Sequence, residues 1–402
     1  MSTVEGAGPA PNSLDLSGLV TGAAQTWGAI RLVPLLRQAP ITDLRLHARL
    51  YDADEPSVVQ VGPRTGYVAY VPHAFVASWS TDGTPMAAYG TQLRDPEERR
   101  PPDGIGLHFR RRMARREEKR RLRLLPLHLA LEGYLALQFG GPSIAWEEWT
   151  RRTVTRGLSP RAEAAYVGAA ITGLDDALRI FEIHADQCGV LIYAADALAA
   201  ALVVPHPDDY RALHPTLLHD MYGELLYEYA RLHRAAVPEF RTRLDAERVD
   251  SVADLRAQLA HARAEWSRFH ALMADGLLGE RITTEPVYRL GRFTLSRFLP
   301  AFDPRVENHL GEMITDEAGT LAYLKTFRLS AAQTRRGHLL SQLAAHDWHL
   351  DATAEALGTD RNGLTGRLDG AGLGHLLRPD IIDAYRHQAR RRQLARPPRR
   401  YR

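Results

Sequence analysis

The sequence predicts a mixed α and β (α+β) N-terminal domain followed by an all-α C-terminal region that contains a helix-turn-helix. Three observations lead to this fold class. Runs of β-branched and aromatic residues, separated by Pro, Gly and Asp, crowd the first quarter of the chain. Apolar residues at helical spacing dominate its last part, and Gly358 interrupts them at a point where the chain would have to turn sharply.

The 402 residues, 45% hydrophobic and 25% charged, suffice for two or three domains with buried cores. Cys188 is the only cysteine, so no internal disulfide can form. The first residues do not resemble a signal peptide, and the longest apolar stretch is too broken to cross a membrane, so we expect a cytoplasmic protein without a membrane partner. The expected domains are a disordered start (1–20), a mixed α/β ligand or partner domain (21–240), a helical connecting region (241–328), a helix-turn-helix domain (329–385) and an Arg-rich tail (386–402).

Short strands are expected throughout residues 27–94, and a helix is expected at 125–139, where apolar residues recur at helical spacing and Gly140 and Gly141 follow. The strand segments are AIRLVPLL, LRLHARL, SVVQVG, TGYVAYVPHAFVASW and PMAAYGTQL. The N-terminal domain therefore begins rich in β-structure.

The second half of this domain is expected to alternate helices and strands. Ser159 and Pro160 favour a helix start, and two helices should extend from there to about residue 184. A strand pair follows at 189–194 and 198–204, and then a helix from Asp208 to about residue 233 that Pro215 breaks or kinks.

Ser251 is expected to cap a helix with one apolar stripe, since apolar residues recur there at alternating steps of four and three. The stripe consists of Leu255, Leu259, Ala262, Trp266, Phe269 and Met273. It is typical of a helix that faces its own core, and it would also suit the seam of a homodimer. Residues 280–305 should form a short connecting unit, and the chain from Asp303 onwards is expected to be helical.

Positive charge is concentrated in two segments. Residues 110–123 hold nine Arg or Lys and two Glu, and residues 386–402 hold eight Arg and no acid. Either segment could bind phosphate groups, because cationic segments gain affinity by releasing counterions from nucleic acid. Either could equally be a solvated arm.

Polar residues cluster around the expected strand pair, at strand ends and at a helix start, which are common places for ligand sites. The candidate acid or base groups are Glu182, His184, Asp208 and Asp209, and the candidate ligand-binding residues are Gln187, His206, Tyr210 and His214. The two aspartates would also suit ordinary helix capping. No P-loop, GxGxxG or GxSxG motif occurs, so neither an enzymatic reaction nor a cofactor is assigned.

No metal site is expected, because His214 and His219 would diverge on a helix. Cys188 lies at the start of an apolar strand, where a buried thiol is usually inert.

The segment DWHLDATAEALGTDRNGLTGRL has the residues that a helix-turn-helix needs. Ala354 is small where two helices would cross, Gly358 permits a sharp turn, and Leu364 and Leu368 form an apolar face. The segment resembles the Fis-type helix-turn-helix found at the end of bacterial enhancer-binding activators. The resemblance implies transcription regulation, with Arg361, Asn362, Thr365 and Arg367 as the exposed residues that contact DNA.

The segment departs from that family in two ways. Gly363 and Gly366 occupy the second helix, where each interior glycine costs about 0.5–1 kcal/mol relative to alanine. Residues 330–385 contain five Arg and seven acids, a net charge of −2, whereas DNA-binding domains are usually basic. We therefore expect the Arg-rich tail, with Arg390, Arg391 and Arg392, to supply most of any DNA affinity, and docking to a protein is the competing interpretation.

A second resemblance covers residues 20–235. The strand pair, the segment PHPDDYRALHPTLLHDMYGELLYEYA and the opening TWGAIRLVPLLR are similar to bacterial domains named for their association with ADP-ribosylglycohydrolases and rhodanese-type phosphatases. The resemblance implies a context of ADP-ribose, nucleotides and NAD metabolism. It transfers no catalytic residue.

Three functions remain open from the sequence. The first is a regulator that couples recognition of a nucleotide or ADP-ribose ligand, or of a partner protein, to DNA binding. The second is an enzyme acting on ADP-ribose, nucleotides or RNA ends. The third is a non-catalytic assembly subunit, in which the helix after Ser251 and the helix-turn-helix are protein contacts.

Overall fold

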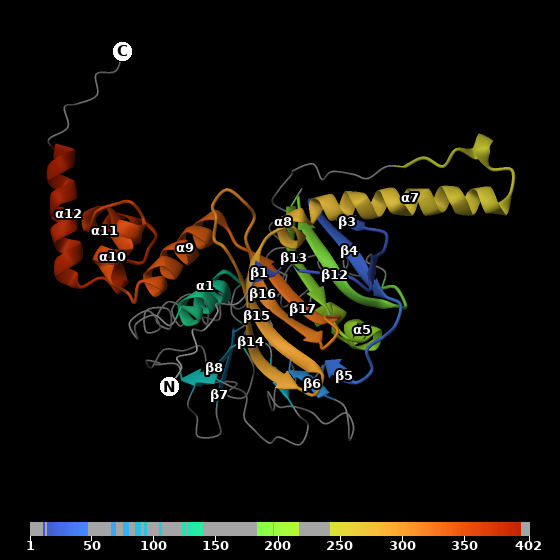
Figure 1. Ribbon diagram of the computed structural model, residues 1–402, viewed down its shortest axis with the longest axis horizontal. Coiled ribbons are helices and arrows are strands. Elements are labelled where there is room, and N and C mark those ends of the chain that lie inside the picture. Colours follow the sequence, from blue (N-terminus) through green and yellow to red (C-terminus); the bar gives the residue numbers. More distant parts are fainter. Residues whose placement is uncertain are drawn as a thin grey trace, which may run out of the picture.

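The fold is seen in a computed structural model of the chain (Figure 1). It describes residues 11–12, 14–46, 66–69, 75–79, 85–89, 92–94, 104–106, 123–124, 127–139, 183–195, 197–216 and 242–394. The expected disordered start up to residue 10, the strand at 57–62, the helices at 159–182, nearly all of the basic run and residues 217–233 lie outside these ranges. So does the tail after residue 394.

A ten-stranded antiparallel sheet forms the centre of the described structure (Figure 1). Its strands come from both ends of the chain, in the order β1-β14-β15-β16-β17-β13-β12-β4-β2, with β3 also paired to β4. The strands are β1 (Pro11–Asn12), β2 (Leu19–Thr21), β3 (Gln25–Trp27), β4 (Ile30–Arg37), β12 (Gln187–Ala194), β13 (Ala197–Val203), β14 (Ile282–Leu290), β15 (Phe293–Pro300), β16 (His309–Asp316) and β17 (Leu321–Arg328). The predicted strands at 29–36, 189–194 and 198–204 are confirmed by β4, β12 and β13.

Two smaller sheets are also described. The three-stranded sheet contains β5 (Leu44–Leu46), β6 (Gly66–Ala69) and β9 (Gln92–Arg94), and its β5 and β6 are parallel. The four-stranded sheet contains β7 (Phe75–Trp79), β8 (Pro85–Tyr89), β10 (Gly104–Gly106) and β11 (Arg123–Leu124).

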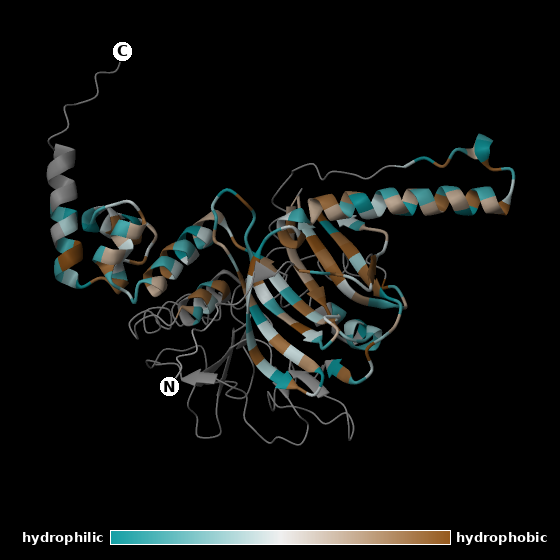
Figure 2. Cartoon of the chain, viewed as in Figure 1, coloured by the Kyte–Doolittle hydropathy of each residue, from teal (hydrophilic) through white to brown (hydrophobic). Residues whose placement is uncertain are grey.

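Both faces of the main sheet are covered. On one face, Val190 and Ile192 of β12 share a hydrophobic cluster with the helices α1 (Leu127–Gln138) and α9 (Ala331–Ala345). On the other face, Leu191 and Tyr193 share a cluster with the short helix α8 (Asp275–Leu278). Because side chains alternate along a strand, a strand buried on both sides is apolar throughout, as Figure 2 shows for the centre of the sheet.

The expectation of a helical connecting region at 241–328 is wrong for residues 282–328, which form β14, β15, β16 and β17. Gly291 and Gly319 turn two of the connections with φ angles of +55° and +83°, which glycine adopts without strain. Charged residues occupy buried positions of these strands, so the alternation of apolar and polar residues that identifies a strand is broken in the sequence. The connecting region is therefore helical only up to Leu278, and four strands follow from Ile282.

The helix predicted after Ser251 is α7 (Val252–Met273), and the Ser251 side chain accepts a hydrogen bond from the Asp254 N–H at 3.2 Å. Its apolar stripe divides into two parts. Near the C-terminal end, Arg31 donates to the Met273 sulfur at 3.1 Å, so this end packs on the sheet. Towards the other end, Leu255 and Leu259 are 38% and 37% exposed, and α7 extends away from the sheet (Figure 1). That a second copy of the chain packs on this exposed part of α7 stays a prediction.

The C-terminal helices after β17 are α9, α10 (Leu350–Ala356), α11 (Arg361–Gly370) and α12 (Pro379–Leu394). Short 3₁₀ helices at η6 (Ala246–Arg248) and η7 (Gly374–Leu376) complete the described helices together with α5 (Pro207–Thr216). The expected boundary between the helical domain and an Arg-rich tail at residue 386 falls inside α12, which continues to Leu394. Within the ranges that the structure describes, none of the helices combines the length and apolar character needed to cross a membrane.

The turn between α10 and α11 has the geometry expected from the sequence. Gly358 has a φ angle of +60°, and the Thr359 N–H donates to the Ala354 carbonyl at 2.9 Å. Ala354, Leu364 and Leu368 are buried between the helices. The described C-terminal region is thus helical, with its packing residues at the predicted positions.

Two buried histidines join helices to the main sheet. His270 of α7 lies among aromatic rings, 4.2 Å from Trp266 and 6.0 Å from Tyr193 between ring centroids. His309 of β16 has one ring nitrogen 3.1 Å from the Gly276 carbonyl and the other 3.0 Å from the Leu198 carbonyl. Burial is the main cause that lowers the pKa of each histidine to about 4. Arg31 contributes to this value for His270, whereas the Leu198 and Gly276 carbonyls oppose the lowering for His309. Both rings are therefore neutral in the folded protein near pH 7.

We expect the free energy of unfolding to decrease as the pH falls from 7 towards 4. The folded-state pKa of His270 and His309 lies below the ordinary value of about 6.5, so the unfolded chain takes up these protons first. Their stabilising effect is complete above pH 6.5 and is lost as the pH falls towards 4. Urea unfolding at pH 7 and pH 5 should show a loss of about 2 kcal/mol for each histidine.

The variant His270→Phe keeps an aromatic ring and removes the titrating group, so it should lose correspondingly less stability between pH 7 and pH 5. The matched control is His261→Phe on the same helix, where the side chain is 71% exposed. Equal pH dependence in the two variants would show that the burial of His270 is not the cause.

Candidate functional site

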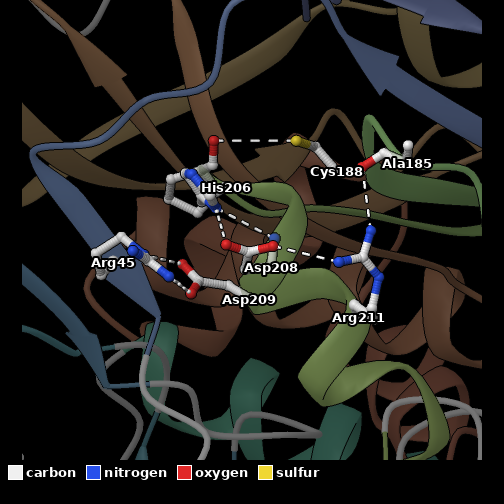
Figure 3. A network of polar contacts seen from close by, with 8 residues as sticks. Arg45, Ala185, Cys188, His206, Asp208, Asp209 and Arg211 are labelled. Carbon is white, nitrogen blue, oxygen red and sulfur yellow. Dashed lines mark hydrogen bonds and ion pairs between the residues drawn. The ribbon is translucent and has the colours of Figure 1, made fainter.

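A polar network lies where β12 begins, β13 ends and α5 starts (Figure 3). It contains several of the residues that the sequence singled out, together with Arg45 of β5. The network forms here because the turn through Pro205 and His206 brings the start of α5 beside the first residues of β12. The Val204 N–H donates to the Cys188 carbonyl at 2.7 Å and closes this turn.

Asp209 is held in a two-pronged ion pair with Arg45. The Arg45 Nη2 atom lies 2.7 Å from Oδ1, and Nε lies 3.0 Å from both carboxylate oxygens. The carboxylate is 6% exposed, and its hydrogen bonds raise the pKa of Arg45. A carboxylate in this geometry anchors α5 to β5 and is poorly placed to exchange protons with a substrate. The candidate catalytic residue Asp209 is therefore a structural anchor.

Asp208, the neighbouring candidate, is exposed and belongs to a different set of contacts. His206 Nδ1 accepts a hydrogen bond from the Asp208 N–H at 3.1 Å and lies 3.6 Å from the Asp208 carboxylate. Arg211 donates to the same carboxylate at 3.3 Å and to the Ala185 carbonyl at 3.3 Å (Figure 3). Asp208 and Arg211 are exposed, and the His206 side chain is 18% exposed. This group of His206, Asp208 and Arg211 is the part of the network that a ligand could reach.

The other candidate ligand-binding residues lie in the interior, so the expectation that they contact a ligand is not supported by their placement. Gln187 accepts from the His184 N–H at 3.1 Å and donates to the Gly189 carbonyl at 3.2 Å. Tyr210 is fully buried, and its hydroxyl hydrogen-bonds with His214 Nδ1 at 3.1 Å. Burial raises the pKa of Tyr210 well above its ordinary range. These side chains hold α5 against the sheet.

Glu182, His184 and Cys188 are the other residues near the strand pair that the sequence singled out. Glu182 lies outside the described residues. His184 is half-buried, and a side chain on Gly22 would approach its Nε2 atom to 3.5 Å. Cys188 is fully buried, and burial raises the pKa of its thiol to about 11 although Arg37 favours the thiolate. The thiol is thus protonated near neutral pH, as expected of an inert cysteine.

Sequence reasoning missed a row of charged side chains on the main sheet. Arg297, Glu312 and Lys325 pair across β15, β16 and β17, with Arg297 Nε 3.4 Å and Lys325 Nζ 3.2 Å from Glu312. Glu312 and Lys325 are almost completely buried, and burial lowers the pKa of Lys325 while Glu312 opposes this effect. No local signal marks these residues, because their pairing depends on strands that the sequence did not predict.

In the described part of the chain, no three His, Cys, Asp or Glu side chains come close enough together to hold a metal ion. The group of His206, Asp208 and Arg211 at α5 instead offers an imidazole, a carboxylate and a guanidinium. Such groups can form hydrogen bonds and ion pairs with a polar ligand.

The fold and this network define an antiparallel-sheet protein with a polar site at one end of its central strands and helices after the sheet. A family model described as ARPP-2 matches residues 14–291, which is more than half of the chain. The chain belongs to the ARPP-2 family. The expected resemblance over residues 20–235 lies inside this match, whereas β15, β16, β17 and the C-terminal helices follow it. No curated protein and no solved structure matches the chain.

We expect Asp209→Asn to lower the free energy of unfolding by about 2–3 kcal/mol, because it leaves the partly buried Arg45 without its charged partner. Asp208→Asn is the matched control and should change stability by less than about 0.5 kcal/mol, since that carboxylate is 64% exposed. Chemical unfolding of both variants measures the difference. Equal effects of the two substitutions would contradict the structural role of Asp209.

Proposed function

We propose that this chain is a regulatory protein in which the sheet domain recognises a nucleotide or ADP-ribose type of ligand and the C-terminal helices bind DNA. The observation that carries the proposal is the arrangement of α10, α11 and α12 beside one another at the end of the chain (Figure 1). Membership of the ARPP-2 family supports the ligand class through the association with ADP-ribosylglycohydrolases that the sequence resemblance implies.

The exposed side chains of α11 support its proposed role as the DNA-recognition helix of a Fis-type helix-turn-helix. Fewer of them are available to contact DNA than the sequence implied. Arg361, Asn362 and Arg367 are exposed, as DNA contacts require. Thr365 is different, because it is 1% exposed and its hydroxyl donates to the Arg361 carbonyl at 2.8 Å. Thr365 is therefore removed from the set of proposed DNA contacts.

The two glycines of α11 have packing roles. A side chain on Gly366 would lie 2.4 Å from the Tyr385 hydroxyl of α12, so glycine allows these two helices to approach closely. A side chain on Gly363 would lie 2.1 Å from the Thr359 hydroxyl, and the Gly363 N–H is held by the Asp360 carboxylate at 2.7 Å. Gly366 thus allows α12 to pack closely against α11 at Tyr385, a role that was not expected from the sequence.

Local ion pairs limit the positive charge of α11 and the first half of α12. Arg361 lies 3.4 Å from Asp351, and Arg386 lies 3.1 Å from Asp369. In the described part of the chain, Arg367 makes no ion pair. We therefore propose Arg367 as the main cation of α11 for DNA, and the arginines at positions 390, 391 and 392 of α12 as the source of most of the affinity.

We expect Arg367→Ala to weaken binding to a preferred duplex by about 1–3 kcal/mol and to relax its sequence preference. Replacing Arg390, Arg391 and Arg392 together by Gln should weaken binding to every duplex and lower the slope of log K against log salt by about 0.9 for each lost phosphate contact. Fluorescence anisotropy across a salt series measures both effects.

The matched control is Arg335→Ala, which removes an exposed arginine from α9 instead of α11. The proposal fails if the full chain binds no duplex in a salt-dependent manner. Sequence recognition by α11 is disproved if Arg367→Ala and Arg335→Ala bind the duplexes with equal affinity and preference. This holds even when the α12 substitutions abolish binding.

An enzyme acting on ADP-ribose, nucleotides or RNA ends is the second candidate. The proximity of His206 to the exposed Asp208 carboxylate favours it, because an imidazole and a carboxylate can serve as acid or base groups. Arg211 would then bind a phosphate group of the substrate.

Both functions predict that the sheet domain binds ADP-ribose, which should raise the midpoint of thermal unfolding by several degrees at ligand concentrations about 100-fold above Kd. Arg211→Ala should remove this shift, whereas Arg248→Ala, an 83% exposed arginine before α7, should keep it. The absence of a shift with ADP-ribose would count against this ligand. Turnover that disappears in His206→Ala would distinguish an enzyme from a regulator.

A further inference from the structure

A single arginine of α9 contacts both the sheet domain and the end of α11. Arg336 forms an ion pair with Glu132 of α1 through its Nη1 atom. Its Nε atom donates to the Ala371 carbonyl at 2.7 Å. Glu132 and Arg336 are 13% and 25% exposed, so the pair is shielded from solvent more than an ordinary surface pair.

The Ala371 carbonyl lies at the C-terminal end of α11, where the last carbonyl groups of a helix have no partner within it. A cation at this end is also favoured by the helix dipole. Gly372 follows with a φ angle of +75°, and a side chain there would approach Arg336 Nη2 to 3.3 Å. The chain therefore leaves room for the guanidinium at the point where α11 ends.

The backbone of α9 beside Arg336 packs on Phe302, which contacts the residue that follows α1. A side chain on Gly337 would lie 2.2 Å from the Phe302 ring, so that ring packs directly on the α9 backbone. The Phe302 ring in turn meets Phe139 edge to face, with 5.7 Å between centroids. Phe302 has a φ angle of +55°, an unfavourable conformation for a residue with a side chain, which this packing holds in place.

We propose that Arg336 is the joint through which α1 of the sheet domain controls the stability of α11. A guanidinium is planar, so its donors to Glu132 and to Ala371 keep a fixed relative orientation. A movement of α1 that displaces the Glu132 carboxylate therefore withdraws the Nε donor from Ala371 and weakens the C-terminal end of α11. The regulatory purpose of this joint rests on the proposed coupling of ligand to DNA, whereas its existence does not.

Hydrogen exchange of the amides at residues 367–373 tests the joint in the full chain without DNA or ligand. Glu132→Gln leaves every group of α11 intact, yet it should increase the exchange rate of these amides about fivefold or more, the lower end of typical coupling between two sites. Arg336→Ala should increase it at least as much. Arg335→Ala, a neighbouring exposed arginine of α9, should leave it unchanged.

The joint is disproved if Arg336→Ala raises exchange at 367–373 while Glu132→Gln does not, because Arg336 would then be only a local cap of α11. It is also disproved if Arg336→Ala equals Arg335→Ala. DNA affinity of Glu132→Gln is measured separately. If its exchange rises and the full chain binds no DNA, the joint stands and the proposed function fails.

Discussion

The pairing of β13 with β17 is the contact on which the rest of the structure depends. Residues 200–203 align with residues 324–327 in antiparallel register, which joins two parts of the chain more than a hundred positions apart. Without this pairing, the main sheet would divide into two groups of five strands. One group would contain β2, β3, β4, β12 and β13, and the other β1, β14, β15, β16 and β17. Each group would then expose an unpaired central edge, a costly arrangement for backbone groups that are otherwise buried.

This junction also determines where the helices lie. The Leu329 N–H, directly after β17, donates to the Asn308 carbonyl at 2.8 Å, and Ser330 then caps α9. Tyr134 of α1 reaches the Gly311 carbonyl of β16 at 3.3 Å, so α1 is placed by the same strands that lead into α9. The meeting of α1 and α9, and with it the position of Arg336, is therefore a consequence of the sheet.

The buried charges beside the junction have a physical role in choosing the register of the strands. Lys325 aligns with Leu202 of β13 and pairs with Glu312 on its other side. Removing both charges from water costs several kcal/mol, which their attraction repays only when the geometry is good. A shift of one residue would turn the two side chains to opposite faces of the sheet. The correct register is thus favoured in two ways. The ion pair stabilises it, and every shifted register would leave the buried charges without their partner.

The same charges explain how much of the fold the sequence could predict. β12 and β13 are apolar apart from Gln187, and β4 is apolar between Arg31 and Arg37. The helices α7, α10 and α11 have caps, turns and apolar spacing that depend on near neighbours. β15, β16 and β17 were missed because Arg297, Glu312 and Lys325 interrupt their apolar faces. For the site, the sequence located the turn around His206 and Asp208. It could not reveal that Asp209 pairs with Arg45, since these residues are 164 positions apart.

The position of α12 restricts how α11 could read DNA. Tyr385 covers Gly366, and Arg386 binds Asp369 at 3.1 Å, so one side of α11 is occupied by another helix of the same chain. A reading helix in the major groove needs an unobstructed face. Leu364, Thr365 and Leu368 are directed into the protein, which leaves the side with Asn362 and Arg367 for a base edge. Any sequence preference would therefore rest on very few side chains of α11.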